Sequence, residues 1–133
     1  NVIAHMMGMF GISQDVMHWP EDVCETVKRG FDAFKEVRHL MSGDFYMLTP
    51  QPDSRNGWVV CQYHMPETGG GVLIAIRLSE SNEDAMEVSP RGLAQSGQVA
   101  FTTLMGDGTA EMTGEGDVRI AFDEGRGALI RYA

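Results

Sequence analysis

The spacing of the hydrophobic residues changes at Ser42-Gly43, and this change constrains the fold more than any other feature of the sequence. Before it, apolar residues recur every three or four positions, which gathers them on one face of a helix. They are Val23, Val27, Phe31, Phe34, Val37, Leu40 and Met41. After it, apolar residues alternate or run continuously in short stretches between turn residues, as they do in strands. The sequence therefore predicts a helix over residues 23–41, followed by β-structure.

The predicted helix has sequence signals at both ends. Pro20 fits the first helical turn, where the missing N–H of proline is no loss. Glu21 and Asp22 suit the positive end of the helix dipole. At the other end, we expect Gly43 to stop the helix in the left-handed conformation, which glycine adopts without a Cβ penalty. A strand should then begin near Asp44 and end at Pro50.

Short strand patterns follow at intervals of about ten residues, which is typical of an antiparallel sandwich. The predicted strands cover residues 45–49, 58–65, 72–78, 85–88, 99–104, 110–112, 118–122 and 128–132. The run 72–78 is so continuously apolar that we expect it to be buried on both faces. We thus predict an α+β, mostly β fold, in which one N-terminal amphipathic helix packs on an antiparallel, Greek-key-like β-sandwich of about seven or eight strands.

Length and charge narrow the classes of function. With 133 residues and 43% hydrophobic composition, the chain suits a soluble globular unit. Its net charge is −9 and its Lys and Arg residues are scattered, so we expect neither nucleic acid nor an anionic membrane as a partner. No apolar run approaches the roughly 20 residues of a membrane span, and no signal-peptide pattern is present. The compartment stays open, with the cytoplasm favoured.

Residues that often bind metals or cofactors form no recognisable motif. Cys24 and Cys61 are too few for a disulfide framework, and we expect two buried thiols. The four histidines lack a short metal-ligand spacing; they are His5, His18, His39 and His64. We therefore expect no metal site and no cofactor. The first ten residues, NVIAHMMGMF, are apolar and ambiguous between a buried strand and the end of a helix.

Two stretches carry a resemblance to a known family. Residues 34–50 read FKEVRHLMSGDFYMLTP, and residues 57–77 read GWVVCQYHMPETGGGVLIAIR. Their order resembles the end of the catalytic barrel and the start of the C-terminal β-domain in α-galactosidases of glycoside hydrolase family 36. The matching positions are Lys35, Arg38, Gly43, Asp44, Tyr46, Trp58, Gln62, Tyr63, Gly71 and Arg77. The tail also resembles the family at Asp107, Gly108, Thr113, Gly114, Ile120 and Tyr132, whereas residues 79–98 match only loosely.

The resemblance implies a division of the chain and a parent enzyme. Residues 1–42 would be the last strand or loop and the final helix of a barrel-like unit, and residues 43–133 would be the C-terminal antiparallel β-sandwich. The family's two catalytic aspartates lie on earlier barrel strands, so no residue of this chain inherits a catalytic role. We expect the parent to be a glycosidase of carbohydrate metabolism, and this chain alone to be inactive.

Three residues are candidate ligand-binding positions. By resemblance, Asp15 follows the eighth barrel strand, and residues at that rim face the substrate. The alternative for Asp15 is a loop or N-capping carboxylate in front of the helix. Trp58 and Tyr63 could stack on a sugar, although aromatic residues of sandwiches more often fill the core.

Three readings of function follow. The first is a non-catalytic C-terminal fragment of an α-galactosidase-like glycoside hydrolase that supports the catalytic barrel. The second is a stand-alone carbohydrate-binding β-sandwich, with a carbohydrate as its partner. The third is a structural or interaction module that forms a homodimer through its apolar N-terminal segment. In that segment, the side chains expected to lack neighbours are Val2, Ile3, Met6, Met7 and Phe10.

Overall fold

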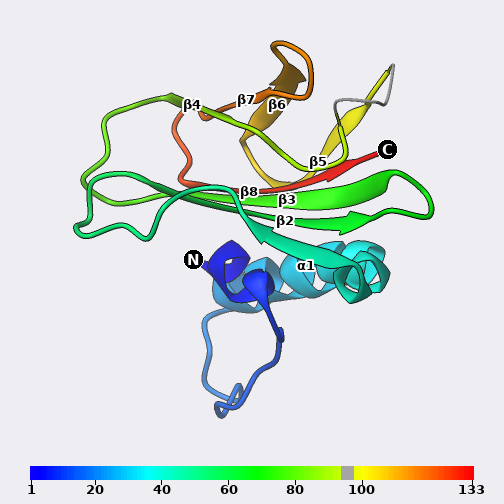
Figure 1. The fold of residues 1–133 in the computed structure, drawn as a ribbon. Coiled ribbons are helices and arrows are strands. Elements are labelled where there is room, and N and C mark those ends of the chain that lie inside the picture. The colour runs from blue at the N-terminus through cyan, green and yellow to red at the C-terminus, as the bar shows by residue number, and fades with distance from the viewer. Residues whose placement is uncertain (94–97) are drawn as a thin grey trace.

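Two antiparallel sheets lie face to face, and helices cover the outer face of the larger sheet (Figure 1). This computed structural model describes residues 1–93 and 98–133. The described strands are β1 (Asp44–Met47), β2 (Trp58–Met65), β3 (Gly70–Arg77), β4 (Ala85–Val88), β5 (Phe101–Gly106), β6 (Thr109–Met112), β7 (Val118–Ala121) and β8 (Gly127–Tyr132). They confirm the predicted α+β, mostly β fold, and each strand boundary lies within two residues of the predicted one.

The strand order is β1-β2-β3-β8-β5 in the larger sheet and β4-β7-β6 in the smaller one. Consecutive strands change sheet after β3, β4, β5 and β7, so β8 returns between β3 and β5. This exchange gives the Greek-key-like connectivity that the strand spacing predicted. Because the chain crosses repeatedly from one sheet to the other, residues far apart in the sequence meet in the core between the two sheets.

Strand β3 confirms the prediction drawn from its continuous apolar run. Val72, Leu73, Ile74 and Ala75 have no exposed surface. The strand pairs with β2 on one side and β8 on the other, and both of its faces are covered. Alternate side chains therefore enter two different cores, which explains why the run shows no polar alternation.

The predicted helix is present, with a tighter last turn than expected. Helix α1 spans Glu21–Val37 and continues as the 3-10 helix η2, Arg38–Ser42. Glu21 and Asp22 lie in its first turn, as predicted, whereas Pro20 is the N-cap residue just before the helix rather than part of the first turn. Its buried residues, including Ala33 and Val37, face the larger sheet.

Gly43 ends the helical segment for a different reason from the one predicted. Its φ is −78° and its ψ is −165°, which is extended rather than left-handed backbone. A Cβ at this position would overlap the carbonyl oxygen of His64 on β2. Glycine is required here because the chain passes close to the β2 backbone as it enters β1, and the expectation of a left-handed cap was wrong.

The ambiguous N-terminal run forms a 3-10 helix, η1 (Val2–Met7), rather than the strand that the family resemblance implies. The side chain of Asn1 accepts a hydrogen bond from the backbone N–H of Ile3 (3.0 Å) and caps this helix. Ile3 and Met6 are buried against the larger sheet. The expectation that they lack neighbours was therefore wrong, because the chain's own sheet covers them. The assignment of residues 1–42 to a barrel-like unit stays a prediction.

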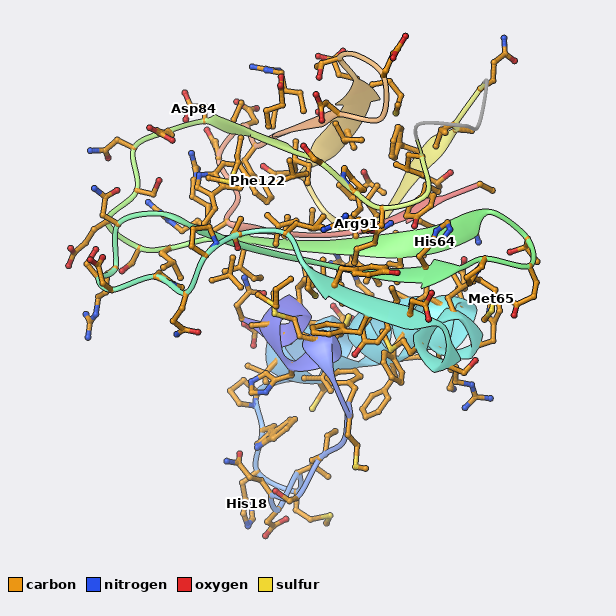
Figure 2. All side chains as sticks on the ribbon, in the orientation of Figure 1. His18, His64, Met65, Asp84, Arg91 and Phe122 are labelled. Carbon is orange, nitrogen blue, oxygen red and sulfur yellow. The ribbon has the colours of Figure 1, made fainter. Side chains whose placement is uncertain are left out.

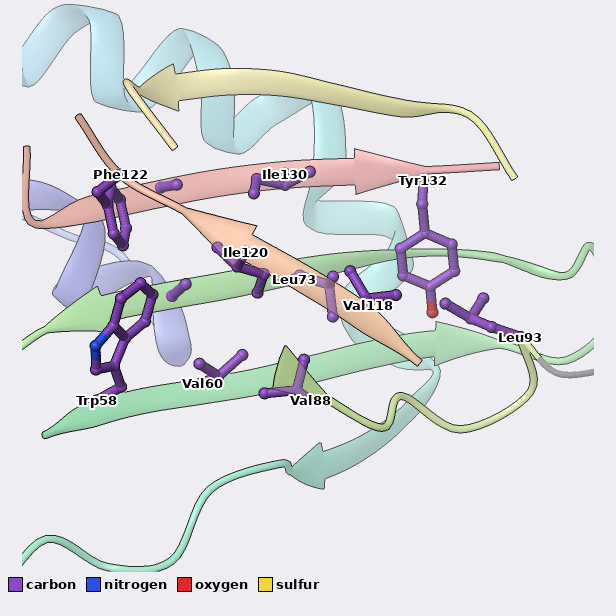
Figure 3. Close-up of a cluster of buried hydrophobic side chains, with 12 residues drawn as sticks. Trp58, Val60, Leu73, Val88, Leu93, Val118, Ile120, Phe122, Ile130 and Tyr132 are labelled. Atoms are coloured by element: carbon purple, nitrogen blue, oxygen red, sulfur yellow. The ribbon is translucent and has the colours of Figure 1, made fainter. Parts of the chain in front are cut away.

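Two hydrophobic cores hold the three layers together. The first lies between the sheets, and Figure 3 shows its side chains converging from both, with Trp58 and Phe122 at one end and Tyr132 and Leu93 at the other. The second lies between the larger sheet and the helices and includes Val37 and Cys61. No helix of the described residues is long and apolar enough to span a bilayer.

The two cysteines have different environments. Cys61 is fully buried in the second core, and burial raises the pKa of its thiol to about 12, so the thiol stays protonated and unreactive at neutral pH. Cys24 is exposed on α1, which corrects the expectation of two buried thiols. Its position on the border of the apolar stripe leaves it on the solvent side of the helix. Neither cysteine forms a disulfide.

Candidate functional site

The three predicted ligand-binding residues lie in three separate places. Asp15 is exposed in the loop between η1 and α1, where its Oδ1 accepts a hydrogen bond from the N–H of Met17 (2.9 Å). This is a local turn that shapes the loop. The geometry is that of a loop carboxylate, and the role of Asp15 at a substrate-facing rim stays a prediction.

Trp58 and Tyr63 lie on opposite faces of the larger sheet. Trp58 is 2% exposed and packs on Phe122 with ring centroids 5.0 Å apart, so its ring faces the inter-sheet core rather than solvent. Tyr63 is half-buried on the helix side, where its hydroxyl donates to the carbonyl oxygen of Met7 (2.8 Å). Trp58 contacts Phe122 in the core between the sheets, and Tyr63 contacts Met7 of η1 on the helix side. The two rings therefore do not form one sugar-stacking platform.

The loop at residues 8–19, which we name the apolar loop, exposes large hydrophobic side chains. Met9 is 98% exposed and Met17 is 81% exposed, with Ile12 and Val16 also exposed. The loop extends from α1 on the side away from the sheets, and His18 lies at its far end (Figures 1 and 2). Because large exposed hydrophobic patches are often interaction sites, the apolar loop is a candidate interaction surface.

The base of the apolar loop is anchored to the helix. The ring of Phe10 packs on Phe31 and Phe34, with centroid separations of 4.6 and 5.5 Å. A hollow of about 410 Å³ lies beside it on the outer surface of α1, between Trp19 and Phe31. Ile12 and Val16 of the loop line this hollow together with residues of α1, which include the charged Lys28, Asp32 and Lys35.

A buried polar network lies between the sheets at the opposite end from Trp58. Gln62 is fully buried, and its Nε2 donates to the hydroxyl of Tyr132 (2.6 Å), which also bonds Nδ1 of His64 (2.8 Å). Burial, the largest cause, raises the pKa of Tyr132 to about 12, so its hydroxyl stays protonated. The sequence signal for this network was the pair Gln62 and His64, two polar residues at alternate positions of β2 that share one buried face of the strand.

The network fixes one turn of backbone outside the core. Gln62 Oε1 accepts from the N–H of Arg91 (2.8 Å), and Gln62 Nε2 donates to the carbonyl oxygen of Arg91 (2.9 Å). The ring of His64 packs directly against Gly92, whose φ of +79° requires glycine. Figure 2 shows Arg91 and His64 on the side of the larger sheet away from α1.

A groove of about 610 Å³, which we name the polar groove, opens beside this turn. One wall is the end of β1, the second is the segment 87–92 that ends β4 and follows it, and the third is the β6–β7 turn at 115–117. The hydroxyl of Ser89 donates to Asp117 Oδ1 (2.7 Å), which joins two of the walls. The groove brings together residues 70 positions apart in sequence, and no motif signalled it.

The described residues hold no group of three His, Cys, Asp or Glu side chains that could bind a metal ion. Of the four histidines, His64 is buried and the other three are exposed on separate segments. The side chains of greatest chemical interest are therefore those of the apolar loop and of the polar groove.

Comparisons with known protein families, with characterised proteins and with solved structures found no match to this chain.

Proposed function

We propose that this chain is the non-catalytic C-terminal part of an α-galactosidase-like glycoside hydrolase, in which the sandwich supports the catalytic barrel. The observation that carries the proposal is the apolar loop, which presents Met9 and Met17 to solvent on the side of α1 away from the sandwich. The resemblance of residues 34–77 to the junction between barrel and β-domain supports the same reading.

The form of the apolar loop supports docking on a larger body. Exposed side chains as large as Met9 and Met17 are unfavourable in water, and burying one fully contributes about 1.5–3 kcal/mol. Phe10 anchors one end of the loop and the turn at Asp15 shapes its tip, so less conformational entropy is lost on binding. Burial against a barrel would remove these side chains from water.

The proposal assigns a mechanical rather than a chemical role to the sandwich. Helix α1 packs on the larger sheet through one face, and its outer face and the apolar loop are available to the barrel. The sandwich would then fix the last helix of the barrel in place. In the proposed enzyme, the two catalytic carboxylates belong to the barrel, with Asp15 near its rim.

The test is to purify the native protein from its source cells with an antibody raised against this chain. We expect a polypeptide several times longer than 133 residues that hydrolyses a chromogenic α-galactoside, whereas the isolated chain shows no turnover. A native protein of the same size as the chain, with no activity, would refute the proposal.

Self-association is the competing use of the same surface. Light scattering on the purified chain separates the two, with Met17→Ser as the variant and Met47→Ser, at the edge of the larger sheet, as the matched exposed control. Two results together would favour a self-associating module over the supporting role. The native protein would have the length of this chain, and the purified chain would form a dimer that Met17→Ser abolishes and Met47→Ser does not.

A further inference from the structure

We propose that the polar groove binds a neutral, hydroxyl-rich ligand, a saccharide of one or two units. The inference is independent of the supporting role, because the groove and the apolar loop lie on opposite sides of the larger sheet. Its volume of about 610 Å³ falls within the range of about 300–1,000 Å³ typical of small-molecule sites.

The groove is held in a fixed shape from within the core. Gln62, fully buried, binds both the N–H and the carbonyl oxygen of Arg91 and so fixes the turn that forms one wall. The bond from Ser89 to Asp117 fixes that wall to the β6–β7 turn. A site preorganised in this way loses little conformational entropy when a ligand binds.

Within residues 1–93 and 98–133, the guanidinium of Arg91 makes no side-chain hydrogen bond and no ion pair, so its donors are available to a ligand. It lies 6.0 Å from the ring centroid of Tyr46, and no carboxylate of the described residues lies within ion-pair distance of it. Three carboxylates nevertheless line the same groove, those of Glu87, Glu115 and Asp117. The guanidinium of Arg91 and these carboxylates therefore line one groove without forming ion pairs with each other.

This arrangement favours neutral hydroxyl groups over anions, because an anion would meet three carboxylates. Hydroxyl groups can both donate to Glu87 and Glu115 and accept from Arg91, so a ligand carrying several of them satisfies both sides. Half-buried Leu48 adds apolar surface for the C–H face of a sugar ring, whereas Val88 is 4% exposed and belongs to the core between the sheets.

The test is a titration of the full chain followed by ¹H–¹⁵N NMR, with galactose and the disaccharide melibiose as neutral probes and sulfate and spermidine as ionic ones. We expect saturable shifts of the amides of Arg91, Gly92 and Gly116 with a neutral probe. Arg91→Ala should weaken binding at least tenfold, and Arg29→Ala, on the exposed surface of α1, should leave it unchanged.

Three outcomes would overturn the inference: no shifts at the groove with either sugar, shifts there with sulfate or spermidine alone, or equal weakening by the two arginine variants. Because Arg91 is exposed, its replacement leaves the core intact, and the unchanged remainder of the NMR spectrum verifies the fold. Failure here leaves the supporting role standing, since that proposal is tested by the size and activity of the native protein.

Discussion

Replacing Arg77 by Met tests whether a buried guanidinium joins three segments at one end of the sandwich. Arg77 ends β3 and is 7% exposed. Its Nη1 donates to Asp84 Oδ1 (2.8 Å), before β4, and its Nη2 donates to the carbonyl oxygen of Gly125 (2.9 Å), before β8. The guanidinium also lies 5.8 Å from the ring centroid of Phe122. One side chain therefore links the turns at which the chain changes sheet.

The expected loss follows from the exposure of each partner. Asp84 is 80% exposed, so solvent screening reduces the worth of that ion pair to about 0–1 kcal/mol. The charged hydrogen bond to the partly buried carbonyl of Gly125 is worth about 1.5–3 kcal/mol. Contact with Phe122 adds about 0.5–1 kcal/mol. Because Met keeps most of the apolar stem, the loss consists mainly of these three contributions, and Arg77→Met should lower the free energy of unfolding by about 2–5 kcal/mol.

The assay is urea unfolding at pH 7, followed by tryptophan fluorescence, to which Trp58, buried against Phe122, and Trp19 both contribute. Asp84→Asn is the matched control, because it removes the exposed charge and keeps a hydrogen-bond acceptor. We expect Asp84→Asn to cost less than about 1 kcal/mol. Equal losses from the two variants would show that the ion pair, rather than the buried hydrogen bond, carries the stability, and would refute the reasoning.

Three further perturbations test other parts of the structure by the same unfolding measurement. Gly43→Ala places a Cβ against the carbonyl oxygen of His64 and should lower the free energy of unfolding by about 1–3 kcal/mol. The control is Gly8→Ala, which has open space around the new Cβ and should change it by less than about 0.5 kcal/mol. Equal effects would contradict the close approach of Gly43 to β2. Tyr132→Phe removes the partner of His64 Nδ1 and one of the two acceptors of Gln62 Nε2, and it should cost about 1–3 kcal/mol. A neutral result would argue against the network. Burial raises the pKa of Cys61 from 9.0 to about 12, so as the pH rises the thiol loses its proton in the unfolded chain before it does in the folded one. The free energy of unfolding should therefore fall by about 1.4 kcal/mol per pH unit between pH 9 and 11. Cys61→Ala should remove this part of the pH dependence, and an unchanged dependence would refute the assignment.

The strands and the helix were predictable because their signals are local. The continuous apolar sequence of β3 predicts that the strand is buried, and turn residues on either side of β2 and β4 indicate where those strands begin and end. The conformation of Gly43 was not predictable in this way. Its need for glycine comes from contact with His64, 21 positions later in the sequence, and a local rule for helix ends names only the residue type.

The candidate sites were less accessible to sequence reasoning for the same physical cause. Trp58 and Tyr63 differ in burial and face because each side of β2 is covered by a different layer, and the spacing within β2 cannot say which layer lies on which side. The polar groove depends on Gln62 reaching Arg91 across the space between sheets. The exposure of Met9 and Met17 was not predicted either, because methionine commonly fills irregular cores and the sequence does not show that no layer covers the loop.

The central claim is that this chain continues, toward its N-terminus, into a catalytic barrel that it supports. Sequencing the coding DNA upstream of the codon for Asn1 tests it most directly. We predict an open reading frame that runs upstream through the earlier strands of a (β/α)8 barrel and encodes two aspartates at the ends of those strands. A start codon immediately before Asn1, or an in-frame stop codon close upstream of it, would contradict the claim.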